Sequence, residues 1–485
     1  MSSPPVPAPA IRSYFFGKGF QDLQDTIRAS WKRNQDSAQE HFRRSGPLFS
    51  SDDMAEKAHG LVLGTAGVSV VVFGTLVFLA ASAVHVLILG IFLALIYTGF
   101  TLVYLTERGY LLAKRFFTVC PVCHTKAQLP QYFCPGCGVV HDRLIPSSYG
   151  ILHHTCRCGH KLPATFFLGR GTLRSQCPEC TQALEQSHTE SRKLFVPVTG
   201  AKSVGKSAFL YTALQELVEH KAGELGLSHS FVEASTERDF ERVRDQFARG
   251  RRPDVTMDAL PRALTVRLDR PGQDPRVLYL YDPAGEAFAD TQGTGLHKYQ
   301  EYLSGLVFLI DPFAIPAVAD EYRTQMAAHA DALRASEVPV EDTFARILIG
   351  MEEFFGLKKG ERIKVPVAVV INKADAFDLE DRIGERAVDA RAAASPTGSP
   401  REAVRDALIR EQLREWGEGP FVQQLETRCA KVRYFTCSSL GRMPDATGRA
   451  FEGRGVLDPV LWIIGETDGA LVGRRRLPFA SAGAR

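Results

Sequence analysis

The stretch Gly200-Ala201-Lys202-Ser203-Val204-Gly205-Lys206-Ser207 decides how this chain is interpreted, because it fills every fixed position of the G-x-x-x-x-G-K-[ST] phosphate-binding loop. The apolar run 194–199 predicts a buried strand before it, and apolar residues at helical spacing over 209–218 predict a helix after it. In such a loop the backbone N–H groups and the helix N-terminus face phosphate oxygens. Lys206 is expected to reach the β- and γ-phosphates, and the Ser207 hydroxyl to bind Mg²⁺.

Two further apolar runs end in polar residues that suit the same ligand. The run 277–281 is followed by Asp282 and Gly285, where the carboxylate would hold Mg²⁺ through water and the glycine N–H would sense a γ-phosphate. The run 365–371 is followed by Asn372-Lys373-Ala374-Asp375. These runs predict that a nucleotide site forms where several strands end.

The second of these motifs selects the base. A carboxylate at Asp375 accepts hydrogen bonds from the N1 and N2 donors of guanine, which adenine lacks. Lys373 is expected to lie along the base and to brace the loop, and Asn372 to tie the strand end to it. Ser438-Ser439, after the run 432–436, fits the last base-contacting turn. An adenine nucleotide is the less favoured alternative.

In this order, the motifs resemble those of the translation-factor-related (TRAFAC) class of P-loop GTPases, over about residues 190–465. The resemblance implies an α/β fold, a Ras-like domain with a mostly parallel sheet. It also implies Mg²⁺-dependent binding and hydrolysis of GTP to GDP, with switch loops that respond to the γ-phosphate.

Residues for the chemical step are expected near the loops that follow. Thr256 is the candidate to complete Mg²⁺ coordination, with Thr265 as a nearby alternative. Arg251 or Arg252 would neutralise transition-state charge in cis, as an arginine finger does. The alternative is that both side chains lie in a solvated loop. Glu286 stands where Ras-like enzymes have a water-positioning glutamine. Its negative charge near the transferring phosphoryl group predicts slow intrinsic GTP hydrolysis. Lys206 is the third residue expected to take part in the chemical step.

The 485 residues carry a net charge of +3, so no strong overall field argues for nucleic acid as a partner. Residues 1–10 are too poor in large apolar groups to fold and are expected to be disordered. Residues 14–45 mix aromatic and charged side chains, which predicts an amphipathic helix on a membrane or on the chain itself.

From Gly60 to Leu105 there is no Asp, Glu, Lys or Arg. A bilayer core takes about 20 helical residues, so this length predicts two membrane helices, near 60–81 and 85–105, with a tight turn at 81–84. Four glycines and Ala80 would let the two helices pack closely. Basic residues on both flanks predict that both termini are cytoplasmic. The alternative is a buried hairpin of a soluble protein.

Eight of the ten cysteines fall between residues 120 and 180. Their spacing predicts two structural zinc sites of four thiolates each, because a cytosolic compartment keeps thiols reduced. The first set is Cys120, Cys123, Cys134 and Cys137, and the second is Cys156, Cys158, Cys177 and Cys180. Nearby histidines as ligands and redox C-x-x-C chemistry are the alternatives.

With its membrane hairpin and cysteines, the chain is similar to the bacterial double-GTPase group of that class. The expected organisation is 1–59 as an N-terminal region, 60–105 as a transmembrane hairpin, 116–142 and 150–185 as zinc ribbons, 190–466 as the GTPase domain and 467–485 as a disordered tail. The expected partners are a lipid bilayer and an unidentified protein or activator. A membrane scaffold that binds GTP without hydrolysing it, and a nucleic-acid-associated GTPase, are the alternative functions.

Overall fold

The computed structural model describes residues 9–113, 116–120, 126–127, 129–184, 191–253, 263–282, 303–355, 360–394, 399–445 and 447–473. The chain divides into two compact units, each of which is described by itself. Unit 1 comprises Met1–Ala113 and Gln131–Ser175, and unit 2 comprises Lys114–Pro130 and Gln176–Arg485. The chain therefore passes from one unit to the other three times.

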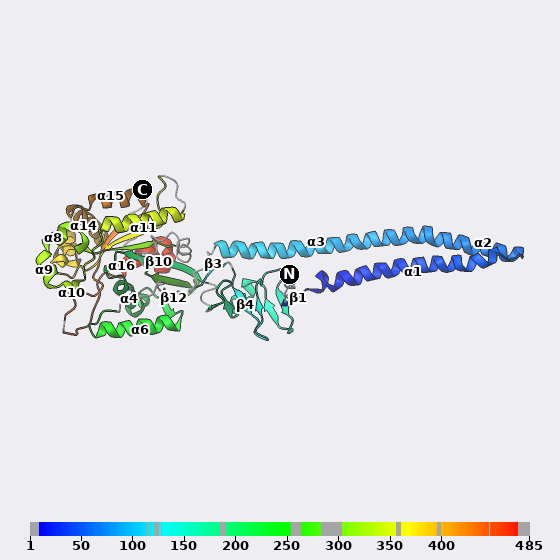
Figure 1. The fold of residues 1–485 in the computed structure, drawn as a ribbon, viewed down its shortest axis with the longest axis horizontal. Coiled ribbons are helices and arrows are strands. Elements are labelled where there is room, and N and C mark those ends of the chain that lie inside the picture. Colours follow the sequence, from blue (N-terminus) through cyan, green and yellow to red (C-terminus); the bar gives the residue numbers. More distant parts are fainter. Residues whose placement is uncertain are drawn as a thin grey trace. The chain divides into compact units, whose positions relative to one another are not determined.

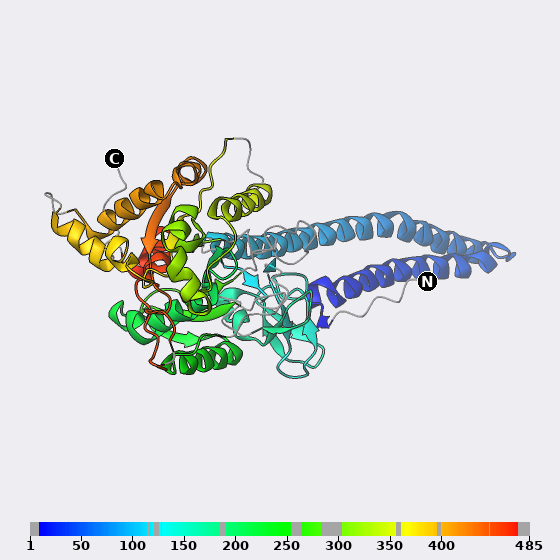
Figure 2. The same cartoon turned by 60° about the vertical axis from the view of Figure 1, so that its left-hand side comes forward.

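Long helices make up most of unit 1. They are α1 (Lys18–Phe49), α2 (Met54–Ser69) and α3 (Thr75–Ala113), preceded by the short turn η1 (Tyr14–Phe16). A π-helical turn, η2 (Val70–Gly74), joins α2 to α3, so that Met54–Ala113 is continuous and, within the described residues, is the one helix long and apolar enough to cross a membrane. Figures 1 and 2 show α1 alongside α2 and the first part of α3.

The turn predicted at residues 81–84 is wrong, because these residues lie inside α3. Ala81-Ser82-Ala83-Val84 contains no glycine, proline or asparagine, and alanine favours the helix more than any other residue. In an apolar segment, a continuous helix also satisfies every backbone hydrogen bond internally. The chain instead reverses at residues 50–53, where the Asp53 side chain accepts a hydrogen bond from the Ala55 N–H at the start of α2.

The glycines of this segment do permit close packing, but their partner is α1. A Cβ at Gly60 would lie 3.0 Å from the Leu48 Cβ, and one at Gly67 would lie 3.0 Å from the Phe42 ring. A Cβ at Gly74 would overlap the Asn34 side chain. Small residues on one face of α2 therefore set how closely α1 approaches.

The rest of unit 1 is a small module of short strands. They are β1 (Ala10–Ile11), β4 (Gln131–Phe133), β5 (Val140–His141), β6 (His153–Cys156) and β7 (Lys161–Pro163), with the 3₁₀ turns η3 (Phe166–Leu168) and η4 (Arg170–Thr172). The strand β8 (Ser175–Gln176) follows. Arg170 forms a buried ion pair of 2.5 Å with Glu107 of α3 and also donates to the carbonyls of Leu144 and Ala164. Its charge is thus compensated, and the pair fastens the module to α3.

A seven-stranded sheet forms the centre of unit 2, in the order β11-β12-β13-β10-β14-β15-β16. The strands are β10 (Arg192–Gly200), β11 (Ser228–Phe231), β12 (Leu264–Asp269), β13 (Arg276–Tyr281), β14 (Leu306–Ile310), β15 (Val367–Ile371) and β16 (Val432–Thr436). The five strands β13, β10, β14, β15 and β16 are parallel, whereas β12 and β11 are added antiparallel. The short strands β2 (Thr118–Val119), β3 (Lys126–Ala127) and β9 (Ala183–Leu184) also belong to this unit.

Helices cover both faces of the sheet, as Figure 1 shows. Side chains of β14 alternate: Val307 and Leu309 pack in the same cluster as α4 and α16, while Leu306, Phe308 and Ile310 pack in the cluster of α11, α14 and α15. This period of two, with both faces apolar, is typical of a parallel sheet buried between helical layers.

The helices of unit 2 are α4 (Lys206–Glu216), η6 (Leu217–Lys221), α5 (Ala222–Glu224), α6 (Ala234–Ala248), η8 (Pro312–Ala314), α8 (Pro316–Glu321), α9 (Arg323–Ala328), α10 (Ala330–Leu333), α11 (Val340–Phe355), α12 (Leu379–Arg382), α13 (Glu385–Ala394), α14 (Arg401–Glu415), α15 (Gly419–Arg428), α16 (Asp458–Thr467) and α17 (Gly469–Val472). The carboxyl ends of the five parallel strands meet at one edge, which in open α/β sheets is where ligands bind.

Candidate functional site

The loop between β10 and α4 has the backbone that a phosphate cradle requires. Gly200 has a φ of 153° and Gly205 a φ of 96°, and Gly205 is the N-cap of α4. A Cβ at Gly205 would lie 2.6 Å from the Asn372 amide nitrogen, so the position has no room for a side chain. Ser203 also adopts a positive φ, of 66°. The left-handed residues bend the chain so that the loop wraps in front of the helix N-terminus.

Two opposite charges meet at this loop. The Lys206 ammonium donates to the carbonyls of Gly200 and Ala201, both at 3.1 Å, and lies 3.9 Å from Oδ1 of Asp282. Burial raises the pKa of Asp282 to about 6, although Lys206 acts in the opposite direction. The Asp282 Oδ1 atom is buried and has no hydrogen-bond partner among the described residues. A buried, under-coordinated carboxylate oxygen next to the loop fits a divalent cation, so Asp282 and Ser207 are suited to hold Mg²⁺.

Asn372 links three of the predicted motifs. Its amide donates to the Val204 carbonyl at 2.8 Å, and its Oδ1 accepts from the backbone N–H and the hydroxyl of Ser439, at 3.0 and 2.9 Å. The residue is buried at the end of β15. The phosphate loop, the end of β15 and the turn after β16 are thus held by one side chain.

The carboxylate of Asp375 faces the turn that contains Ser438. The Ser438 hydroxyl donates a short hydrogen bond to Asp375 and accepts from the Gly441 N–H at 2.7 Å. Asp375 is partly exposed. Its carboxylate is therefore oriented by a neighbour and still has acceptor capacity for a guanine edge.

Lys373 has a partner that sequence reasoning missed. Its ammonium donates to Oδ2 of Asp311 at 2.6 Å and to the carbonyls of Leu333 and Arg334 at 3.1 and 3.0 Å. Asp311 directly follows the apolar run of β14, just as Asp282 follows β13 and Asn372 follows β15. That position, one residue beyond a buried strand, is the signal that would have found it.

A sequence comparison decides the family. The sequence model of Double-GTPase 2 matches residues 194–446, just over half of the chain. The chain belongs to the Double-GTPase 2 family. The matched residues hold every nucleotide-binding motif described above, while the long apolar helix and the cysteine clusters lie before them.

Solved structures of GTP-binding proteins also resemble the chain. A structure described as nucleolar GTP-binding protein 1 from Plasmodium falciparum is 10% identical, with a TM-score of 0.23, over 59% of this chain and 90% of that one. The signal recognition particle receptor SRb with GDP from Chaetomium thermophilum is 13% identical, with a TM-score of 0.21, over 57% and 99%. Among curated proteins no match is found.

Part of the predicted site of this Double-GTPase 2 member lies outside the described residues, namely Thr256, Gly285 and Glu286. The alternative threonine, Thr265, lies in β12, is buried, and has its hydroxyl 3.5 Å from that of Thr236. This position inside a strand differs from the loop position expected of a switch threonine. Arg251 is exposed.

Arg252 does not point simply into solvent. Its Nη1 donates to the Asp331 carbonyl at 3.3 Å, and its Nε is buried without a hydrogen-bond partner among the described residues. Burial lowers its pKa, as does Arg334, whereas Asp375 acts in the opposite direction. The guanidinium therefore lies on the side of the site where Asp375 is placed.

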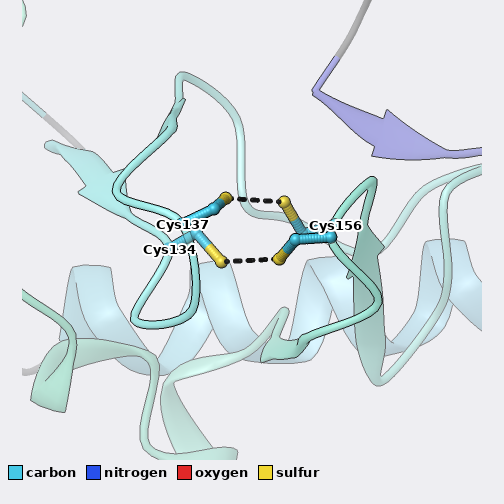
Figure 3. A group of neighbouring side chains, drawn as sticks. Cys134, Cys137 and Cys156 are labelled. Carbon is cyan, nitrogen blue, oxygen red and sulfur yellow. Dashed lines mark hydrogen bonds between the residues drawn. The ribbon is translucent and has the colours of Figure 1, made fainter.

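The eight clustered cysteines combine differently from the prediction. Cys134 and Cys137 gather with Cys156 and Cys158, and Cys120 gathers with Cys177 and Cys180, while Cys123 lies outside the described residues. In the first group, Sγ atoms of Cys134 and Cys158 lie 3.6 Å apart, as do those of Cys137 and Cys156 (Figure 3). The predicted sets are therefore wrong for the described cysteines: Cys134 and Cys137 share a site with Cys156 and Cys158, whereas Cys120 shares one with Cys177 and Cys180.

Sulfur separations of this size fit a metal. They far exceed a disulfide bond of about 2 Å. Four sulfurs at about 2.3 Å from a tetrahedral Zn²⁺ would lie about 3.8 Å apart. The Sγ atoms of Cys120 and Cys180 lie 3.5 Å apart, close to the same value. Both groups therefore suit a cation held by thiolates.

Proposed function

We propose that this protein is a membrane-anchored GTP-binding switch that hydrolyses GTP to GDP and phosphate, with two structural zinc sites. The observation that carries the proposal is the convergence of four motifs at one sheet edge. Asn372 contacts the phosphate loop and Ser439 directly, and Lys206 lies next to Asp282. Membership of the Double-GTPase 2 family supports the same function.

Each residue has a distinct role in this proposal. The backbone of residues 200–205 receives the phosphates, and Lys206 leaves its loop carbonyls to neutralise phosphate charge. Ser207 and Asp282 would hold Mg²⁺, which would supply positive charge next to the phosphates. Asp375 accepts from the guanine N1–H and N2–H groups, and Ser438 orients it. Thr256 would complete the Mg²⁺ coordination, and the Gly285 N–H would sense the γ-phosphate.

Hydrolysis is proposed to be slow without a partner. Glu286 would orient the attacking water, but a carboxylate also adds negative charge beside the transferring phosphoryl group. An activating protein that supplies positive charge would then control the lifetime of the GTP state. We therefore propose that a second protein acts as the activator of GTP hydrolysis.

We further propose that the Met54–Ala113 helix anchors the protein in a bilayer. Most of its large apolar side chains are exposed, including Leu61, Phe73 and Leu95 at 60, 67 and 63%. As a helix, the charge-free stretch 60–105 is about 69 Å long, more than twice a bilayer core of about 30 Å. As one continuous helix, the segment would cross the bilayer once and place its two basic flanks on opposite sides, so the expectation that both flanks are cytosolic would need a reversal inside the segment.

The two cysteine groups are proposed to bind zinc for structural reasons. The first group has four thiolates, and Cys123 is proposed as the fourth ligand of the second; with four thiolates, neither site would have an open position for catalysis. The strands around them are two to four residues long and enclose few apolar side chains. Metal binding therefore supplies folding free energy that the small core does not.

Calorimetry and phosphate release on the full chain in detergent test the function. With Mg²⁺ present, the protein is expected to bind GDP and GTP, to bind ATP much more weakly, and to release phosphate from GTP. Tight binding of GTP with no phosphate release would identify a non-hydrolysing scaffold instead. No heat with either guanine nucleotide would refute the proposal.

A further inference from the structure

The carboxylate of Asp311 connects the base-recognition loop to a separate segment of the chain. Its Oδ1 accepts from the Phe313 N–H at 3.0 Å, and its Oδ2 accepts from the Ser336 N–H at 2.8 Å and from Lys373 at 2.6 Å. The side chain is fully buried. Asp311 thus joins both ends of the segment 312–336 to Lys373.

The same segment holds the far end of the recognition loop. The Phe377 ring stacks on that of Tyr322, with centroids 5.4 Å apart and planes 12° apart, and meets the Phe313 ring edge-on at 5.6 Å. The Tyr322 hydroxyl donates to Asp378. Residues on both sides of Asp375 are therefore in contact with 312–336, which comprises η8, α8, α9, α10 and their connections.

The backbone conformation of the recognition loop depends on these contacts. Lys373 and Phe377 have φ values of 58° and 56°, a left-handed conformation that side chains other than glycine adopt at an energetic cost. Such a conformation persists only where the surroundings hold it in place. The contacts of Lys373 with Asp311 and of Phe377 with Tyr322 provide that hold.

A third contact joins the segment to the loop that follows α6. Arg252, which precedes the segment that holds Thr256, donates to the Asp331 carbonyl near the end of α10, where Leu333 and Arg334 accept from Lys373. The carbonyls of 331–334 therefore accept from cations on two different loops. The segment 312–336 touches both of them.

We propose that the segment 312–336 is a brace that holds the guanine-recognition loop in its binding conformation, with Asp311 as the positioning residue, and that it thereby sets the rate of nucleotide release. This inference rests on the proposed function, because it concerns the same nucleotide site. A partner that displaces the brace would speed the exchange of GDP for GTP.

Release of a fluorescent GDP analogue from the full chain in detergent tests the inference. Asp311→Asn keeps the acceptor for Phe313 but removes the charge that holds Lys373. It is expected to speed release about tenfold or more, the scale of one charge-assisted hydrogen bond, and to reduce discrimination between GDP and ADP. Asp320→Asn, an exposed site on α8, is the matched control and should release at the wild-type rate.

Two more variants secure the outcome. Combined with Lys373→Met, Asp311→Asn should add little further, because both changes remove the same interaction. Tyr322→Phe removes only the hydroxyl, which donates to Asp378 and accepts from Arg382. It should speed release by a few fold, which decides the matter if Asp311→Asn does not fold. Release at the wild-type rate in the folded variants would overturn the brace. If the wild-type chain bound no guanine nucleotide, the proposed function itself would fail.

Discussion

Replacing Cys134 and Cys156 together by serine is expected to remove one zinc ion from each chain and leave the other. The structure places both sulfurs in one group, with all four of its ligand atoms within 4.8 Å of one another. The double variant leaves this group with two thiolates, too few for a structural zinc site. The group that contains Cys120, Cys177 and Cys180 keeps all its ligands.

A second double variant, called the crossed variant, takes one cysteine from each group and tests the same grouping from the other side. Cys120→Ser with Cys134→Ser removes one thiolate from each group, so both sites become three-coordinate and should lose zinc to a chelator. Had the sequence-predicted sets been right, the first variant would have damaged both sites and the second only one. The two groupings therefore predict opposite results for the same pair of proteins.

The assay is the zinc content of the purified full chain by mass spectrometry, before and after a chelator challenge. The wild type is expected to retain two zinc ions per chain. Cys429→Ala serves as the control, because Cys429 is buried in the core of unit 2, away from both groups. One chelator-resistant zinc in the crossed variant, with none in the Cys134/Cys156 variant, would refute the observed grouping.

Three further predictions concern the nucleotide site. Asp375→Asn should weaken GDP binding about tenfold or more in competition assays while leaving ATP binding unchanged, because a guanine donor loses its charged acceptor; an unchanged preference for GTP would contradict the base assignment. Asp282→Asn should stabilise the nucleotide-free protein by roughly 3 kcal/mol at pH 7, because a pKa raised from 3.8 to about 6 means that folding favours the uncharged form. Melting curves should show this gain in stability at pH 7. The gain should disappear as the pH falls through about 6 toward 3.8, because the wild-type carboxylate is then protonated in the folded and the unfolded state. An equal gain at pH 3.5 would contradict the argument that burial of the charged carboxylate destabilises the wild type. Glu286→Gln should speed single-turnover GTP hydrolysis, and a fast wild-type rate without a partner would argue against slow intrinsic turnover.

Much of the nucleotide site was accessible from the sequence because each motif is local. A phosphate loop needs a strand, glycines and a helix within some twenty residues, and all of these precede or follow Gly205 directly. Asp282 and Asn372 end apolar runs, and the carboxyl ends of parallel strands meet at the same edge. The structure places Lys206 beside Asp282 and Asn372 against Val204, as that reasoning requires.

Features that depend on distant contacts were not accessible in this way. Asp311 follows an apolar run, as Asp282 and Asn372 do, but its partners Lys373 and Ser336 lie far away in the sequence and are visible only in the structure. The clustered cysteines form four short pairs, 120/123, 134/137, 156/158 and 177/180, and the members of each pair lie two or three positions apart. The sequence therefore does not show whether neighbouring pairs share a metal or whether the two middle pairs share one. Glycines in the apolar segment correctly indicated close helix packing, but not that α1 would be the partner.

The way the chain alternates between its two units has a practical consequence. Fragments of multidomain proteins are usually made by one cut in a linker, but no single cut separates these units, since residues 114–130 belong with 176–485. A fragment that begins at residue 185 would discard Phe116, which bridges to Arg192 at the start of β10, and Phe117, whose ring lies 5.6 Å from the Lys193 ammonium. An excised nucleotide-binding piece should therefore begin at residue 114 and carry a short linker in place of residues 131–175.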